Sequence, residues 1–290
     1  MKKINTYTEG KYNCNPHESL ENGNIEKFKW MAEQSKIKNG TRVLELGSGN
    51  GSFLRFIKET YEAEPVGLCN SEPQVKLNAE QGIKVILADI WEIPESLHGK
   101  FDCVVLNGST EHFCTWKNHH EMDDKLKQLF LEINKCIDPK SDNGRVVITA
   151  ITQHRDFSIY EKMQIYLLER TYGGYYALKP SSYEDNAEDF KLVVRENHTD
   201  DYYIWARRIW WNVLNSITEP TVMLNTLKDI PVFLLNDPYY IHKILHIIMG
   251  SWPWQFECPY IPLLSEDDTP PFQHQWIVLE KNKLCEPETN

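Results

Sequence analysis

The segment "RVLELGSGNGSF", residues 42–53, constrains the fold more than any other part of the chain. A run of large apolar residues leads directly into glycines at alternate positions, Gly47, Gly49 and Gly51, and apolar residues at helical spacing follow. This order predicts a buried strand, a tight turn and a helix over 52–63. At the carboxyl end of such a strand, a ligand can contact main-chain N–H groups without obstruction by Cβ atoms. We therefore expect a binding site at the tip of this strand.

Predicted strands and helices alternate along the chain as far as residue 151. Short apolar runs predict further strands, and the amphipathic runs between them predict helices. The strands are expected at 65–69, 83–89, 101–108 and 144–151, and the helices at 72–82 and 123–137. This alternation predicts a doubly wound α/β fold with a mostly parallel sheet.

Aromatic residues change the pattern in the second half of the chain. Three aromatic-rich stretches predict helices, at 156–181, 202–217 and 237–252. Two late apolar runs predict strands, at 190–197 and 274–281, which bring the sheet to seven strands. We expect a single domain over 1–290, with a core of 36–152 plus the late strands and an aromatic helical cap of about 153–189 and 198–265 inserted among the last strands.

The charge balance excludes several kinds of partner. Lysine and arginine number 31 against 42 acidic residues, a formal net charge of −11, and no run of basic residues occurs. This balance argues against nucleic acid or an anionic membrane surface as the main partner. No stretch approaches the roughly 20 apolar residues of a spanning helix, so we expect a cytoplasmic protein without stable membrane insertion. The seven cysteines include no Cys-x-x-Cys pair and indicate neither a disulfide framework nor a zinc site.

Glu45 is the unusual residue of the first strand, because a buried strand disfavours a charge. It stands two residues before the first glycine, so we expect its carboxylate at the mouth of the crevice, where it repels a phosphate and attracts a cation. The glycine spacing also differs from the G-x-G-x-x-G pattern of dinucleotide-binding turns. Both features favour a ligand with a positive centre over the pyrophosphate of a nicotinamide cofactor.

The stretch "VLELGSGNG" resembles the first motif of class I S-adenosylmethionine-dependent methyltransferases. Further segments narrow the resemblance to the cyclopropane fatty acid synthase and mycolic acid methyltransferase family. In chain order they are "KYNC", "VGLCNSEPQ", "NGSTEHF", "GGYYALKPS", "YIWARRIW" and "HQWIVLEK". Each is weak alone, but six in the family's order, covering Tyr12 to Lys281, are a strong indication.

The resemblance implies S-adenosylmethionine as the cofactor and assigns residues to its parts. The positions it implies, from the methionine end to the adenine end and the floor below the sulfonium, are Tyr12, Glu45, Gly47, Ser48, Gly49, Asn70, Gln74, Asp89, Ile90, Trp91 and Gly108. Within this set, Tyr12 would close over the methionine moiety. Asn70, which stands where the family has an apolar residue, would meet the ribose together with Gln74.

The chemistry is expected beside the fourth strand, at "STEHF". Methyl transfer from a sulfonium needs alignment, and a base where the acceptor must lose a proton. A buried carboxylate stabilises the positive charge, and desolvation raises its pKa toward that of a useful base. Glu111 is therefore the candidate base, with His112 as its neighbour or proton shuttle.

In the cyclopropane synthases, the resemblance further implies, a bound bicarbonate acts as base. The matching positions are Cys14, Glu111, Thr149, Ile151 and Tyr203. Thr149 departs from the family's histidine: a hydroxyl can bond an anion but cannot shuttle a proton as imidazole does. A bicarbonate site is thus left open.

The acceptor is expected to be small or lipid-like. Only 13 residues precede Cys14, which indicates a lid shorter than the family's or rebuilt. With the acidic balance, this favours a soluble or carrier-borne acceptor over bilayer phospholipid. The favoured function is transfer of a methyl or methylene group to a lipophilic or natural-product acceptor, with an unsaturated carbon as one candidate. An N- or O-methyltransferase, a nicotinamide-dependent oxidoreductase and a non-catalytic nucleoside-binding module remain alternatives, and the oligomeric state, a homodimer included, stays open.

Overall fold

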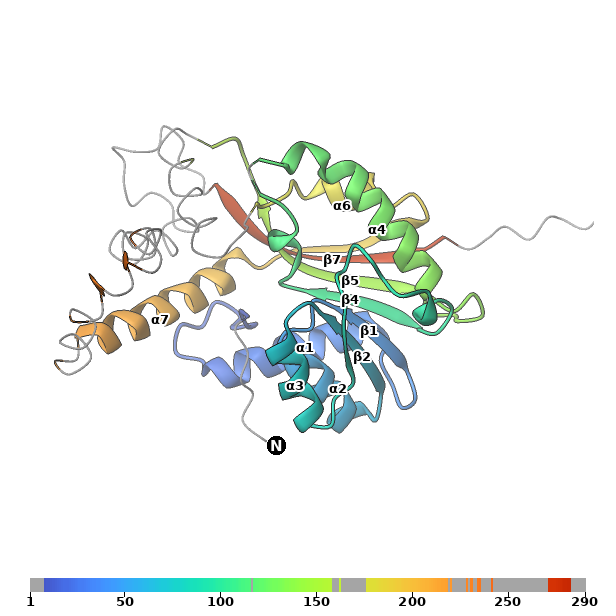
Figure 1. The fold of residues 1–290 in the computed structure, drawn as a ribbon, viewed down its shortest axis with the longest axis horizontal. Helices are drawn as coiled ribbons and strands as arrows, with labels where there is room; N and C mark the ends of the chain where they lie inside the picture. The colour runs from blue at the N-terminus through green and yellow to red at the C-terminus, as the bar shows by residue number, and fades with distance from the viewer. Residues whose placement is uncertain are drawn as a thin grey trace, which may run out of the picture.

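The computed structural model describes residues 8–115, 117–157, 176–218 and 271–282, with isolated positions between 162 and 241. A seven-stranded sheet in the order β3-β2-β1-β4-β5-β7-β6 runs through it (Figure 1). The strands are β1 Arg42–Leu46, β2 Glu64–Cys69, β3 Val85–Leu87, β4 Cys103–Asn107, β5 Arg145–Gln153, β6 Phe190–Asn197 and β7 Phe272–Lys281. Every strand predicted from the sequence is present, so the mostly parallel doubly wound sheet is confirmed.

The strand order reverses between β1 and β4. From β1 the chain adds β2 and β3 on one side, and then returns to add β4 and β5 on the other, all in parallel. β7 is inserted antiparallel between β5 and β6. In such sheets, a crevice opens at the carboxyl ends of the strands where the order reverses.

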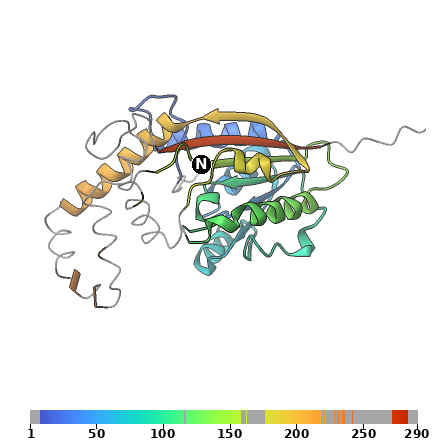
Figure 2. The same cartoon turned by 90° about the horizontal axis from the view of Figure 1, so that it is seen from above.

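The helices cover both faces of the sheet. They are α1 Leu20–Gln34, α2 Ser52–Tyr61, α3 Glu72–Glu80, α4 Met122–Cys136, α6 Ser181–Asp185 and α7 Thr199–Thr218, with short 3-10 turns η1 Glu95–Leu97, η2 Thr110–His112 and η3 His119–Glu121. In Figure 2, α1 and α4 lie on opposite sides of the sheet. None of the helices in the described residues is long and apolar enough to cross a membrane.

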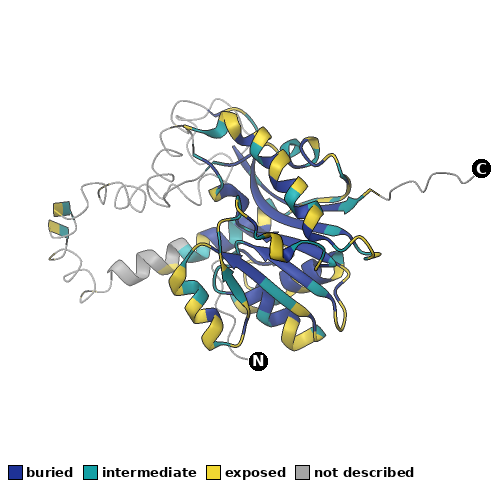
Figure 3. Ribbon diagram, turned by 45° about the vertical axis from the view of Figure 1, so that its right-hand side comes forward, coloured by how far each residue is buried: buried dark blue, intermediate teal, exposed yellow. Residues whose placement is uncertain are grey.

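Alternation along the strands divides the core in two. Val43 of β1 and Val105 of β4 point toward α1 and α2, where they join Phe28 and Phe53. The alternate residues of the same strands, such as Leu44 and Val104, point toward α4 on the other face. Figure 3 shows the buried strands and the exposed outer faces of the helices. The central strands β1 and β4 are therefore buried on both faces, as expected for parallel strands.

The cap is described only in part. α7 confirms the helix predicted at 202–217, and its first turns pack Tyr202 and Trp205 against Tyr12 and Phe272. From there α7 extends away from the sheet (Figure 1). The helix predicted at 237–252 and most of the one at 156–181 lie outside the described residues, so the division into core and cap stays a prediction.

Helix α1 is an element that the sequence did not predict. Its first turns contain Gly23 and Asn24, which are poor helix formers, and this obscures the apolar residues that follow. Ser19 caps the helix by accepting a hydrogen bond from Asn22 N at 3.0 Å. Gly23 is required by packing, because a Cβ atom there would lie 2.2 Å from Cε1 of Tyr12.

Gly23→Ala tests this packing, because helix propensity and packing predict opposite changes in stability. Propensity alone favours alanine by about 1 kcal/mol. We expect overpacking against Tyr12 to prevail and lower the melting temperature by about 2–6 °C. The control is Asn22→Ala at the neighbouring exposed position, which should leave the melting temperature unchanged or raise it. A higher melting temperature for Gly23→Ala would contradict the packing described.

Candidate functional site

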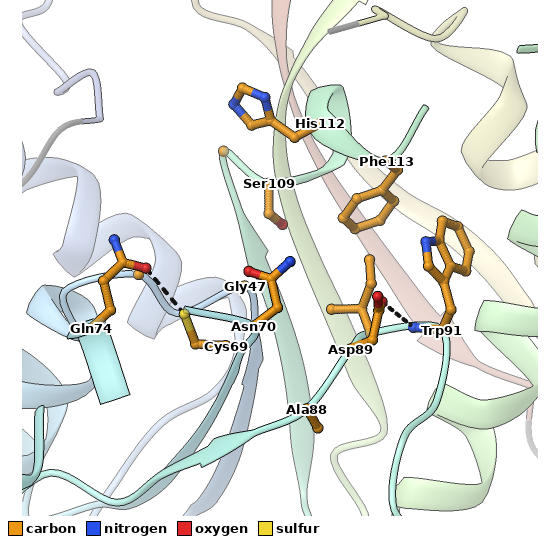
Figure 4. Close-up of a pocket in the computed structure, with 13 residues that line it drawn as sticks. Gly47, Cys69, Asn70, Gln74, Ala88, Asp89, Trp91, Ser109, His112 and Phe113 are labelled. Atoms are coloured by element: carbon orange, nitrogen blue, oxygen red, sulfur yellow. Dashed lines mark hydrogen bonds between the residues drawn. The ribbon is translucent and has the colours of Figure 1, made fainter. Parts of the chain in front are cut away.

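Two adjoining cavities, of about 470 and 160 Å³, open at the carboxyl ends of the strands around β1 and β4. They share Gly47, Gly49, Gln74 and Gly108, so they form one elongated site. Figure 4 shows the larger of the two. The predicted cofactor-binding residues that line one or both of them are Glu45, Gly47, Ser48, Gly49, Asn70, Gln74, Asp89, Ile90, Trp91 and Gly108. Tyr12 is the member of the predicted set that lines neither cavity.

The glycine turn gives the site its shape. Gly47 has a φ of +78°, a left-handed conformation that side chains rarely adopt, and a Cβ there would lie 2.7 Å from Cβ of Ser109. The main-chain N–H groups of Gly47 and Ser48 both donate to Leu68 O, which ties the turn to β2. Asn78 holds the other side: its buried amide donates to Gly49 O at 2.9 Å. Asn78 was missed, although a lone polar residue on the inward face of α3 is a signal for such a contact.

Glu45 lines the smaller cavity and is buried, so it does not stand at the mouth as the sequence suggested. Its side chain is 2% exposed, and burial raises its pKa to about 8. Asn107, which donates a hydrogen bond, and the charge of Lys27 act in the opposite direction. Among the described residues, Oε2 of Glu45 has no hydrogen-bond partner. A buried carboxylate with an unused oxygen facing a cavity is suited to bind a ligand cation.

The aromatic rings of Trp91 and Phe113 line one end of the larger cavity. The Trp91 ring meets the Phe113 ring edge to face, with centroids 5.3 Å apart, and Lys125 Nζ lies 5.7 Å from the Trp91 centroid. Asp89 accepts a hydrogen bond from Trp91 N at 3.0 Å (Figure 4). Asn70 and Gln74 also line this cavity, with Gln74 on the side away from Trp91 (Figure 4). This end is therefore suited to a planar ring with polar groups at its edge.

Glu111 lies beside the junction of the two cavities, on the η2 turn after β4. Its Oε1 lies 4.0 Å from where a Cβ on Gly108 would stand, and its side chain is buried. Burial raises the pKa of Glu111, and the charges of His112 and His274 lower it. The His112 ring lines the larger cavity, whereas Glu111 lies next to Gly108, which lines both cavities, and does not itself line either.

Residues 8–19, here called the N-terminal strap, close the smaller cavity. Thr8 is part of its lining, and the next residue, Glu9, is buried, forms an ion pair with Lys27 of α1 and lies beside His274 of β7. Trp276 Nε1 donates to His274 Nδ1 at 3.1 Å, which leaves the ring proton on Nε2, 3.1 Å from Glu9 Oε1. No local pattern predicts the cluster of Glu9, Lys27 and His274, because its three members come from separate elements that only the fold brings together.

Tyr12 also belongs to the strap, and its side chain is buried. Its hydroxyl has no hydrogen-bond partner among the described residues, and burial raises its pKa. Arg208 of α7 lies over the ring, 5.5 Å from its centroid. The orphaned hydroxyl makes Tyr12 a candidate for ligand contact, although its side chain lines neither cavity.

The structure does not bring the remaining predicted anion ligands to either cavity. Cys14 is exposed, and its Sγ lies 3.9 Å from Oδ2 of Asp200, whose charge together with burial raises the thiol pKa. The Tyr203 hydroxyl accepts from Arg207 Nη1 at 2.8 Å. Thr149 donates to Asn107 Oδ1 at 3.1 Å. In the part of the chain that the structure describes, no group of three or more His, Cys, Asp or Glu residues could hold a metal ion.

Comparison with solved structures identifies the fold as that of class I methyltransferases. The cyclopropane synthase MmaA2 from Mycobacterium tuberculosis superposes with a TM-score of 0.68 at 15% identity, over 95% of this chain and 90% of that one. Coclaurine N-methyltransferase, solved with N-methylheliamine and SAH, superposes with a TM-score of 0.63 at 15% identity, over 97% of this chain and 78% of that one.

The family follows from the sequence. The model of the mycolic acid cyclopropane synthetase family matches residues 2–233, and the chain belongs to this family. The cyclopropane-fatty-acyl-phospholipid synthase of Escherichia coli K12 is 28% identical over 95 residues, 33% of this chain. The chain thus spans about a quarter, 25%, of the length of this curated relative.

Glu45→Gln tests the burial of Glu45 through the pH dependence of stability. The folded-state pKa is raised to about 8, so the stability that the neutral form contributes is lost as pH rises from about 4.5 through 8. A glutamine avoids this loss. We expect the variant to melt about 3 °C or more above the wild type at pH 8.5, and at the same temperature as the wild type at pH 4.5. Glu64→Gln, at the exposed start of β2, is the control. A pH-independent difference would contradict the assignment.

Glu9→Gln tests the ion pairs of the strap. It leaves the Lys27 ammonium buried without its counter-charge, and we expect a loss of about 3 kcal/mol in unfolding free energy. Adding Lys27→Met should restore most of that loss, because the double variant buries no unpaired charge. Denaturant unfolding of the two single variants and the double variant gives the coupling energy. Additive losses would show that the pair contributes nothing.

Proposed function

We propose that the protein is an S-adenosylmethionine-dependent methyltransferase of small lipophilic acceptors. The observation that carries the proposal is the pair of joined cavities, with the unpartnered Oε2 of Glu45 at one end and the aromatic rings of Trp91 and Phe113 at the other. S-adenosylmethionine carries an ammonium, a sulfonium, a ribose and an adenine along one elongated molecule. The glycine turn between the two ends leaves room for the middle of such a ligand.

Each part of the site has a role in this proposal. Glu45 binds the ammonium, Asn70 and Gln74 meet the ribose hydroxyls, and Asp89 faces the adenine edge. The cofactor supplies an electrophilic methyl group on sulfur. The N-terminal strap excludes water from the methionine end, so that the charge of Glu45 acts in a low dielectric. Gly108 keeps the floor of the site free of a side chain.

Glu111 is the base in the proposed reaction. Its burial raises its pKa and thus increases its affinity for a proton. Oε1, the oxygen near Gly108, is the atom that would take the proton from the acceptor. We favour Glu111 itself over a bound bicarbonate, because Cys14 faces carboxylates and the Thr149 hydroxyl is bonded to Asn107.

The acceptor class follows from charge and family. With a net charge of −11, the protein is poorly suited to an anionic bilayer surface, which favours a small or carrier-borne acceptor. An unsaturated carbon is the first candidate, in line with family membership. A nitrogen or oxygen of a natural product is the second, because the fold is shared with coclaurine N-methyltransferase. Cytoplasmic location and a homodimer stay predictions.

Glu111→Gln separates binding from chemistry. If Glu111 removes a proton from a carbon acceptor, turnover should fall at least about 100-fold. Affinity for S-adenosylhomocysteine, measured by calorimetry, should stay within about threefold. Glu45→Gln is the matched counterpart and should weaken that affinity more than about tenfold.

Two results would contradict the proposal at different levels. Full turnover of a carbon acceptor by Glu111→Gln would remove the role of the base. No binding heat from the wild type with S-adenosylmethionine or S-adenosylhomocysteine would remove the proposed function itself.

A further inference from the structure

Three neighbouring strands bring polar side chains close together beside the smaller cavity. Glu45 comes from β1, Asn107 from β4 and Thr149 from β5. In the sheet register, Glu45 pairs with Val105 and Asn107 pairs with Thr149. Asn107 lies two residues beyond Val105, so the three side chains share one face of the sheet, with Glu45 diagonal to Asn107. All three are buried. Buried polar groups at this density need a common explanation.

Hydrogen bonds connect the three in one direction. The Thr149 hydroxyl donates to Asn107 Oδ1 at 3.1 Å, and the Asn107 side chain donates to the Glu45 carboxylate. Because the amide oxygen is engaged by Thr149, the amide NH₂ group is the part of Asn107 left to face Glu45. Thr149 O also accepts from Gly108 N at 2.9 Å, which fixes the backbone on which Asn107 is held.

We propose that Asn107 and Thr149 are positioning residues that keep the Glu45 carboxylate charged and aimed at the ammonium of the bound cofactor. This inference rests on the proposed function, because it takes Glu45 as the ammonium-binding group. Neither residue needs to touch the cofactor's ammonium. Asn107 acts through Glu45, and Thr149 acts through Asn107.

The physical reason is the orientation of one amide group. Without the Thr149 hydroxyl, Asn107 can turn over and present its oxygen to Glu45, and two facing acceptors favour the protonated carboxyl. Lys27 of α1 is the charged group that faces Glu45, and it is itself paired with Glu9. Lys27 thus offers Glu45 a charge at a distance, whereas Asn107 offers a direct hydrogen bond.

Thr149→Val is the decisive variant, because it removes the hydroxyl and keeps the shape. Affinity for S-adenosylhomocysteine is measured by calorimetry from pH 6.5 to 9.5, as the ratio of wild type to variant. The ratio cancels the ligand's own titration. We expect about a tenfold weaker affinity at pH 7, the equivalent of a pKa of Glu45 raised by about one unit, and a ratio near one at pH 9.5. Thr149→Ser, which keeps the hydroxyl, should restore the wild-type profile.

Thr152→Val is the matched control on the same strand. Thr152 is equally buried and donates to Gln273 O at 3.3 Å, away from both cavities. It should leave affinity unchanged at every pH. Asn107→Asp provides a second test, because a carboxylate beside Glu45 should raise the pKa of Glu45 further and weaken affinity at pH 7 more than Thr149→Val does.

The outcomes separate this inference from the proposed function. Unchanged affinity in Thr149→Val, or a weakening by the same factor at every pH, would overturn the positioning role while the wild type still bound the ligand. Absence of binding by the wild type would overturn the proposed function itself. If Thr149→Val does not fold, Asn107→Asp decides: unchanged affinity at pH 7 would overturn the positioning role.

Discussion

The site depends on one carboxylate held in the protein interior against its solvation. Glu45 lies near the end of a buried strand, with one amide donor and one distant ammonium to stabilise its charge. In the free protein this arrangement is unfavourable, since burial disfavours the ionised form. A ligand that brings its own positive charge removes the penalty. The cost of burying the Glu45 charge in the free protein therefore becomes a gain in binding free energy when a cationic ligand occupies the site.

Lys27 links this carboxylate to the rest of the site. Its ammonium is completely buried and interacts with Glu9 of the strap, Glu45 of the cofactor site and Glu111 of the proposed active site. A single interior cation therefore faces three carboxylates with different roles. Because Glu9 takes the direct ion pair, Glu45 and Glu111 keep the raised pKa values on which the proposed binding and proton transfer depend.

The sequence predicted local features better than contacts between distant segments. All seven strands and most of the cofactor-lining residues were found, because strand periodicity and the glycine turn are local signals. Helix α1 was missed because Gly23 weakens its pattern. The partnership of Glu9 with Lys27 and His274 was missed because a buried charge is indistinguishable from a surface charge until the fold is known. The motif resemblance assigned Cys14 and Thr149 to a bicarbonate site. In the structure, Cys14 lies near Asp200 and Thr149 is hydrogen-bonded to Asn107.

The antiparallel strand β7 has a consequence for the order in which the protein can be completed. It comes from near the end of the sequence, yet it lies between β5 and β6 and carries His274, the anchor for Glu9. During synthesis on the ribosome, β5 must wait with an open edge until residues 272–281 have emerged. The amino-terminal segment can lock over the cavity only after that, so a nascent chain stopped short of β7 would have neither a finished sheet nor a closed site.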